Sequence, residues 1–160
     1  MTRVLHGEPD YRHLLSCFAT GVTVATTVDD NGLPIGMTAS AVSAVSINPP
    51  LLLVCVSKIA RFHDALTGNT GFALNILAEH QEDISELFAR GLDNPFRHVP
   101  HTEGPGGLCL LDDVVAHIIC GSWSTYDAGD HTVFFGEVQR GQVFERAPLI
   151  HYRSRYTTTL

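Results

Sequence analysis

The amino-acid sequence predicts a mainly β fold, an all-β barrel flanked by a few helices. Two observations favour this class: many short β-rich runs are separated by tight turns, and only two or three helical patterns occur. A doubly wound α/β fold would need a helix of ordinary length between most strands, and the sequence lacks them. We expect a single domain over residues 1–160, since this length suits one compact unit.

The first part of the chain predicts a helix followed by a hairpin. Apolar side chains recur at helical spacing from Tyr11 to Phe18. A strand rich in Val and Thr over residues 22–28 leads into an Asn-Gly turn, and Pro34 places the start of the return strand at a sheet edge. Residues 37–47 are predicted as one extended segment, whose small side chains leave room on its face.

The middle of the chain contains the most apolar run, residues 51–56. Its sequence, Leu-Leu-Leu-Val-Cys-Val, predicts a central strand in a sheet covered on both faces. A short helix is expected around Phe62 and Leu66, stopped by the following glycines. A strand over residues 72–77 and an amphipathic helix over residues 78–90 follow.

The last part of the chain predicts a long loop and then strands. Residues 92–107 are rich in Pro and Gly, and a loop of this length is expected to be functional or to cover something. Strands are expected over residues 114–123, 132–139 and 142–144, with Arg140 and Gly141 in a turn.

Composition excludes several classes of function. With 10 Lys and Arg residues against 17 Asp and Glu residues, the net charge is −7, so no basic face for nucleic acid is expected. The longest apolar run is far shorter than the roughly 20 residues that cross a bilayer, so no membrane partner is expected. No signal peptide is visible at the start, which predicts a cytoplasmic location. The four cysteines lack metal or disulfide spacing, and we expect them to be small buried hydrophobes.

Two short segments carry residues suited to binding. Ser57, Lys58 and Arg61 follow the most apolar strand, and a hydroxyl with two cations before a helix suits a phosphate. A solvated turn is the alternative. His131 follows a Gly-Asp turn at the start of a strand, where it can donate a hydrogen bond or carry a proton. Its alternative is a plain turn residue.

Other chemistries lack their motifs. His98 and His101 are separated by Pro100, and no Cys or acidic pair nearby completes a tetrahedral set, so no metal site is expected. The sequence holds neither G-x-G-x-x-G nor a Walker loop, which excludes a Rossmann or P-loop nucleotide site. A G-x-S-x-G nucleophile elbow is also missing.

Six groups of residues follow one another along almost the whole chain, from about Tyr11 to Tyr156. They are Phe18 to Val24; Gly36 to Ala41 with Val45-Ser46 and Pro49 to Leu51; Phe72 to Leu77; Gly129 to His131; Gly136 to Val138; and Pro148-Leu149 with Tyr152. In this order they resemble the flavin reductase family, the small components of two-component flavin-dependent monooxygenases. The resemblance implies an FMN-binding split β-barrel, usually a homodimer with flavin near the subunit interface. It also implies NAD(P)H-dependent reduction of FMN or FAD for a partner monooxygenase.

The resemblance implies cofactor contacts at particular positions. Three small residues match the segment beside the isoalloxazine ring and ribityl chain: Thr38, Ala39 and Ser40. Three polar residues match the region that meets the flavin phosphate: Ser57, Lys58 and Arg61. Asn75 matches a polar strand position whose amide serves either flavin or backbone. Many relatives have Asn-Ser-Phe where this chain has Ser-Ala-Val at residues 40–42, so the choice between FMN and FAD stays open.

The resemblance also implies a nicotinamide site. His131 matches a histidine placed near the nicotinamide, and Arg153 and Tyr156 match the C-terminal segment near that pocket. Hydride transfer from nicotinamide C4 to flavin N5 needs the rings about 3 to 3.5 Å apart, so the protein's task is positioning. His131 is expected to orient or polarise the nicotinamide amide. NADH and NADPH both stay open as donors.

Two other functions remain as alternatives at this level. A flavin-retaining oxidoreductase or oxidase on the same barrel would use flavin as a prosthetic group. A barrel that only binds a flavin or haem-like ligand would not be an enzyme, since fold does not fix function.

Overall fold

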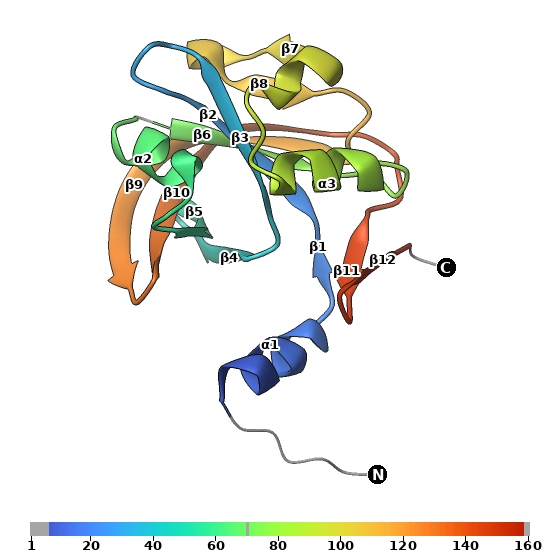
Figure 1. Ribbon diagram of the computed structural model, residues 1–160. Coiled ribbons are helices and arrows are strands. Elements are labelled where there is room, and N and C mark those ends of the chain that lie inside the picture. Colours follow the sequence, from blue (N-terminus) through green and yellow to red (C-terminus); the bar gives the residue numbers. More distant parts are fainter. Residues whose placement is uncertain (1–6, 70, 159–160) are drawn as a thin grey trace.

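The computed structural model describes residues 7–69 and 71–158 (Figure 1). Strands dominate, which confirms the mainly β prediction. Residues 1–6, part of the segment on which the expected cytoplasmic location rests, lie outside the described residues. The elements are α1 Glu8–Ser16, β1 Thr20–Gly21, β2 Thr23–Val28, β3 Pro34–Ala39, β4 Val42–Ile47, β5 Pro50–Ser57, α2 Arg61–Thr67, β6 Gly71–Ile76, α3 Glu82–Ala89, η1 Pro95–His98, β7 His101–Glu103, η2 Pro105–Gly107, β8 Cys109–Leu111, β9 Ala116–Ala128, β10 His131–Val143, β11 Ile150–Tyr152 and β12 Arg155–Thr157.

The main sheet has seven antiparallel strands in the order β3-β2-β6-β9-β10-β5-β4. Its two edge strands are consecutive in the chain, and only Ser40 and Ala41 join them. The sheet must therefore curve until its edges approach each other at this link, which is compatible with a split barrel. Pro34 begins the edge strand β3, as predicted. Two smaller sheets, β1-β11-β12 and β7-β8, complete the described part.

The core consists of two main clusters. One fills the inside of the curved sheet and includes Leu52, Val54 and Phe134. The other lies under α3 and the segment that follows it. There the rings of Phe88 and Phe96 pack edge to face, with their centroids 5.0 Å apart. Phe96 is buried, so the long loop predicted at residues 92–107 covers the second cluster.

Three strand predictions were wrong in detail. Residues 37–47 form two strands on opposite edges of the sheet, because the chain turns at Ser40 and Ala41. The predicted central strand, β5, lies second from the edge, between β10 and β4. Arg140 and Gly141 form no turn: β10 runs through them beside β9, and a register shift between Val138 and Arg140 absorbs the irregularity.

The ends of other elements also differ from the sequence prediction. The helix expected over residues 78–90 begins only at Glu82, after a turn, and Gly91 ends it with a φ of 63°. The hairpin of β11 and β12 was not predicted, since its turn contains no glycine. Arg153 and Ser154 adopt φ angles of 50° and 59° there.

The four cysteines are free thiols that differ in their burial. Cys109 and Cys120 are buried, as expected, and Cys55 is partly buried. Cys17 is exposed, because it lies at the C-terminal end of α1 outside the core. The prediction of burial was therefore wrong for Cys17.

Helix α1 lies apart from the main sheet, next to the hairpin of β11 and β12 (Figure 1). The Arg153 N–H donates to the Ser16 carbonyl at 2.6 Å. The apolar stripe that predicted this helix is more than half exposed: Tyr11, Leu14, Leu15 and Phe18. None of the helices formed by residues 7–69 and 71–158 is long and apolar enough to span a membrane.

Candidate functional site

One cavity on the described surface has a volume of about 540 Å³. Strand β3, the loop from β5 into α2, and the C-terminal end of α3 form its walls. Its lining includes Thr38, Ile59, Arg61, Phe88, Arg90 and Asn94. This volume falls within the range of small-molecule sites. The cavity therefore brings together Thr38 and Arg61, two of the residues predicted to bind flavin.

Close packing of β3 against α3 shapes the inner wall of this cavity. A Cβ atom on Gly36 would lie 2.7 Å from Phe88 Cε1 and 3.0 Å from Phe96 Cζ. Only glycine fits this position without moving an aromatic ring. Gly36 thus lets the strand that carries Thr38 approach the helix.

Charge at the mouth of the cavity comes from two arginines. Arg61 pairs with Asp93, and Arg90 pairs with Glu86 one helical turn away at 3.1 Å. Both pairs are largely exposed, so each contributes little to stability and is free to exchange its partner for another anion. The site therefore offers guanidinium groups to a phosphate.

Thr38 is linked to Tyr156 through a residue that the sequence analysis missed. The Thr38 hydroxyl donates to the Ser85 carbonyl at 2.5 Å, and the Ser85 hydroxyl bonds the Tyr156 hydroxyl at 2.9 Å. Ser85 is fully buried in α3. Strands β3 and β12, which are distant in sequence, are thereby fixed to the same helix.

The other two residues of the predicted flavin segment differ in exposure. Ala39 is buried, and its carbonyl accepts the Thr23 hydroxyl at 2.7 Å. Ser40 is exposed in the link between the edge strands. Close approach of a ligand to this segment is therefore possible at Ser40 rather than at Ala39.

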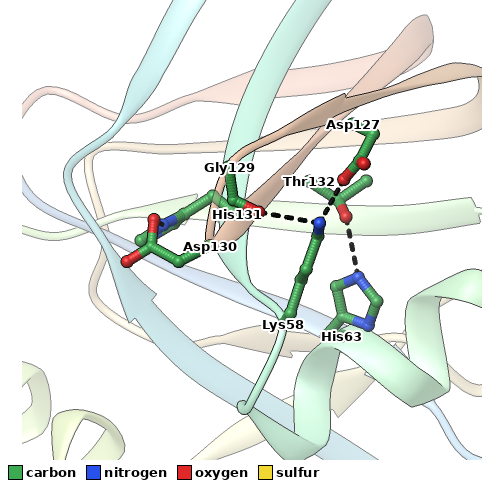
Figure 2. Close-up of polar contacts among 7 residues, drawn as sticks. All are labelled: Lys58, His63, Asp127, Gly129, Asp130, His131 and Thr132. Atoms are coloured by element: carbon green, nitrogen blue, oxygen red, sulfur yellow. Dashed lines mark hydrogen bonds and ion pairs between the residues drawn. The ribbon is translucent and has the colours of Figure 1, made fainter.

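A second group of predicted residues lies where β5 ends and β10 begins (Figure 2). Ser57 is opposite His131 in the antiparallel register of these strands. His131 Nδ1 lies 2.8 Å from Asp130 Oδ1. This hydrogen bond and the charge of His131 hold the pKa of the Asp130 carboxyl below its ordinary value. The imidazole is thus oriented by its neighbour while 44% of its side chain stays exposed.

Lys58 is not among the residues that line this cavity. Its ammonium donates to the Gly129 carbonyl at 2.7 Å and pairs with Asp127, while its backbone N–H donates to the Asp130 carbonyl at 3.0 Å (Figure 2). Arg61 lies at the cavity instead. The structure therefore does not gather Lys58 and Arg61 around one phosphate position.

Asn75 is fully buried, and its amide group bonds the backbone. Nδ2 donates to the Val24 carbonyl at 3.0 Å and, more weakly, to the Cys109 carbonyl at 3.4 Å. Oδ1 accepts the Leu111 N–H at 2.8 Å. Of the two roles predicted for this amide, the structure supports the backbone role and leaves no surface for a flavin contact.

Arg153 does not lie beside His131 in one chain. Its guanidinium is 5.3 Å from the centre of the Tyr152 ring, at the tip of the hairpin of β11 and β12. Figure 1 shows this hairpin and the turn between β9 and β10 on different sides of the fold. The three residues predicted for the nicotinamide site are therefore divided between two regions.

Among the described residues, no three or more His, Cys, Asp or Glu side chains gather in a way that could hold a metal ion. His101, which sequence spacing singled out, bonds the Val99 carbonyl through Nδ1 at 2.7 Å.

Comparison with known proteins gives consistent matches. Residues 15–160 match the model of the flavin reductase like domain. The chain is 38% identical over 148 residues to the reductase subunit HsaB of a flavin-dependent monooxygenase from Rhodococcus jostii, covering 92% of this chain and 75% of that protein. It is 40% identical over 147 residues to a flavin reductase (NADH) from Kitasatospora aureofaciens, covering 89% and 77%.

A solved structure with the same fold is the NADH:FAD oxidoreductase SgcE6 of Streptomyces globisporus, in complex with NAD and FAD fragments. It superposes with a TM-score of 0.91 at 34% identity and covers 95% of this chain and 92% of that one. Some other curated relatives are longer, and the chain spans 44% to 55% of three of them.

Proposed function

Because this chain belongs to the flavin reductase family, we propose that it reduces FMN or FAD with NADH or NADPH and passes the reduced flavin to a flavin-dependent monooxygenase. The observation that carries this proposal is the cavity of about 540 Å³ in which Thr38 and Arg61 meet. We retain the expected cytoplasmic location as part of the proposal.

The residues around the cavity fit a flavin. Apolar side chains such as Phe62 and Phe88 and the small Gly36 line its interior, which suits a flat aromatic ring. Arg61 stands at the mouth, where its guanidinium can exchange the exposed Asp93 for a flavin phosphate. When bound, flavin supplies the hydride-accepting chemistry, and the protein supplies binding and orientation.

His131 is the residue that we assign to the nicotinamide. Nδ1 faces the Asp130 carboxylate, so Nε2 is the ring nitrogen left to form a hydrogen bond with the nicotinamide amide. Ser57 lies opposite His131 at the end of β5 and can offer its hydroxyl to the same ligand. The task of these groups is to hold the two rings at a distance suited to hydride transfer.

We also propose that the protein is a homodimer. The residues of β10 that alternate with the buried Phe134 face the outside of the sheet, and there Val133 and Phe135 are only half buried. Tyr126 on β9 is opposite Val133 and is 67% exposed. His131 lies at the end of the same face. A second copy covering this face would bury apolar surface and close one side of the nicotinamide site.

The dimer proposal is tested by Tyr126→Glu. We expect this substitution to yield monomers in light-scattering chromatography, because it places a charge in an apolar contact. Leu33→Glu, at an exposed site in the turn between β2 and β3, is the matched control and should leave the mass unchanged. A wild-type protein that is already monomeric at micromolar concentration contradicts the proposal.

The activity is tested with the purified protein. The absorbance spectrum is recorded first, and then oxidation of NADH and of NADPH is followed without flavin and with excess FMN or FAD. We expect turnover that depends on added flavin and saturates with it. A yellow protein whose turnover ignores added flavin would instead hold flavin as a prosthetic group, and flavin binding without nicotinamide oxidation would refute an enzymatic role.

A further inference from the structure

Lys58 is the only lysine in the sequence. Among the described residues, its side chain and backbone N–H make their polar contacts with the short segment of residues 127–130. The backbone N–H bonds the Asp130 carbonyl at 3.0 Å, and the ammonium bonds the Gly129 carbonyl at 2.7 Å. The ammonium also pairs with Asp127 (Figure 2). Lys58, which directly follows β5, therefore contacts the turn between β9 and β10 from Asp127 to Asp130.

This turn sets the position of His131. Gly129 adopts a φ of 65°, a conformation that glycine tolerates best. Asp130 follows it, and His131 is then the first residue of β10. The Asp130 carboxylate fixes the ring of His131 through Nδ1. A shift of the Gly129 or Asp130 backbone would therefore move both the imidazole and the carboxylate that orients it.

Figure 2 shows polar side chains on two sides of the turn. The Lys58 ammonium and Asp127 lie on one side, and Asp130 and His131 lie on the other. An anion that bound the ammonium would compete with Asp127, and it would lie across the turn from His131. The placement of Lys58 is thus that of a support for the turn.

We propose that Lys58 is a positioning residue for the nicotinamide site, which holds the turn of residues 127–130 so that His131 and Asp130 stay aligned, and that it does not bind the flavin phosphate. This inference rests on the proposed function, because His131 is taken to meet the nicotinamide. It departs from the role that the family resemblance implied for Lys58.

Two substitutions separate the positioning role from a phosphate role. Lys58→Met removes the ammonium, and Asp127→Asn removes its anionic partner while keeping the ammonium and the side-chain shape. If Lys58 supports the turn, both variants have the same defect. If Lys58 binds the phosphate, Lys58→Met weakens FMN binding, whereas Asp127→Asn frees the ammonium and strengthens it.

We expect both variants to lower kcat/KM for NADH by about 10-fold. This is less than the roughly 100-fold loss that a misplacement of 1 Å can cause. The Kd for FMN should stay within about twofold of the wild-type value, since the support does not touch the cavity. Lys58→Arg, which can pair with Asp127 and the Gly129 carbonyl together, should restore most of the activity. Arg146→Met breaks a comparable ion pair with Asp113 elsewhere and is the control without effect.

A spectroscopic measurement tests the support without any turnover. The ring signals of His131 in two-dimensional NMR spectra should shift in Lys58→Met and Asp127→Asn and return in Lys58→Arg. Unchanged His131 signals with a weaker Kd for FMN in Lys58→Met would overturn the proposal. A wild-type protein that oxidises neither NADH nor NADPH would refute the proposed function, while the NMR comparison would still decide the role of Lys58.

Discussion

Truncation of Asn75 distinguishes a structural amide from a cofactor contact. Asn75 is fully buried between β2 and β8, and its side chain makes hydrogen bonds to the backbone of both. We expect Asn75→Ala to destabilise the flavin-free protein strongly. We expect it to leave the affinity of the folded fraction for FMN almost unchanged, because the side chain has no exposed surface.

The size of this effect follows from the bonds that are lost. The Leu111 N–H loses its 2.8 Å bond to Oδ1, and a buried donor left without a partner costs about 1–3 kcal/mol. The 3.0 Å bond to the Val24 carbonyl contributes a further ~0.5–1.5 kcal/mol. The Cys109 carbonyl keeps its 2.8 Å hydrogen bond from the Thr26 hydroxyl, so losing the weaker bond from Asn75 costs little. A total of about 1.5–4.5 kcal/mol corresponds to a fall of Tm by roughly 3–18 °C for a protein of this size.

The assay is urea and thermal unfolding without flavin, followed by far-UV circular dichroism, together with a titration of FMN into the folded variant. Asn31→Ala is the matched control, because it removes the same amide from an exposed turn, and we expect a change within about 0.5 kcal/mol. An unchanged unfolding midpoint combined with a clear loss of FMN affinity would refute the structural role of Asn75.

Three further predictions concern the turn at His131 and the cysteines. His131→Ala should lower turnover or raise KM for NADH with FMN affinity nearly intact, and unaltered kinetics would remove His131 from the mechanism. Since the pKa of the Asp130 carboxyl lies below its ordinary 3.8, wild-type protein should be more stable than Asp130→Asn above about pH 4. This difference should shrink as the pH falls through the lowered pKa, and a difference that grows as the pH falls contradicts it. In thiol labelling at pH 8, the exposed Cys17 should react first. Burial raises the pKa of Cys109 to about 11 and that of Cys120 to about 12, so these thiols react slowly. Equal labelling rates for all four cysteines of the folded protein would contradict this.

Local signals in the sequence predicted the elements that depend on local chemistry. The Asn-Gly turn predicted the hairpin of β2 and β3, and helical spacing predicted α1 and α3. The hairpin of β11 and β12 escaped prediction because Arg153 and Ser154 occupy positions where glycine or asparagine is usual. The full length of β10 was not predicted, because the Arg-Gly pair at residues 140–141 resembles a turn in the sequence, whereas the strand continues through a register shift there.

The candidate site depends on contacts between distant parts of the chain, and the sequence predicted only some of its residues. Thr38 and Arg61 line one cavity, and their contact with flavin stays a prediction. Ser85 carried no signal, because a serine on an amphipathic helix reads as surface until the Tyr156 hydroxyl is seen beside it. The sequence assigns Lys58 to a phosphate from its place beside Arg61 after the apolar strand. Its contact with the Gly129 carbonyl, 71 positions further on, leaves no local signal.

The apolar run of β5 shows what composition can and cannot establish. Six consecutive apolar residues predicted a strand covered on both faces, but within one chain only the face of Leu52, Val54 and Val56 is buried. The opposite face, with Leu53 and Cys55, is half buried and continues across Val133 and Phe135. The pattern therefore identifies both faces as apolar without saying what covers the second one. A second copy of the chain on the outer face would satisfy the pattern, and the same contact would enclose the end of β10, where His131 begins the strand.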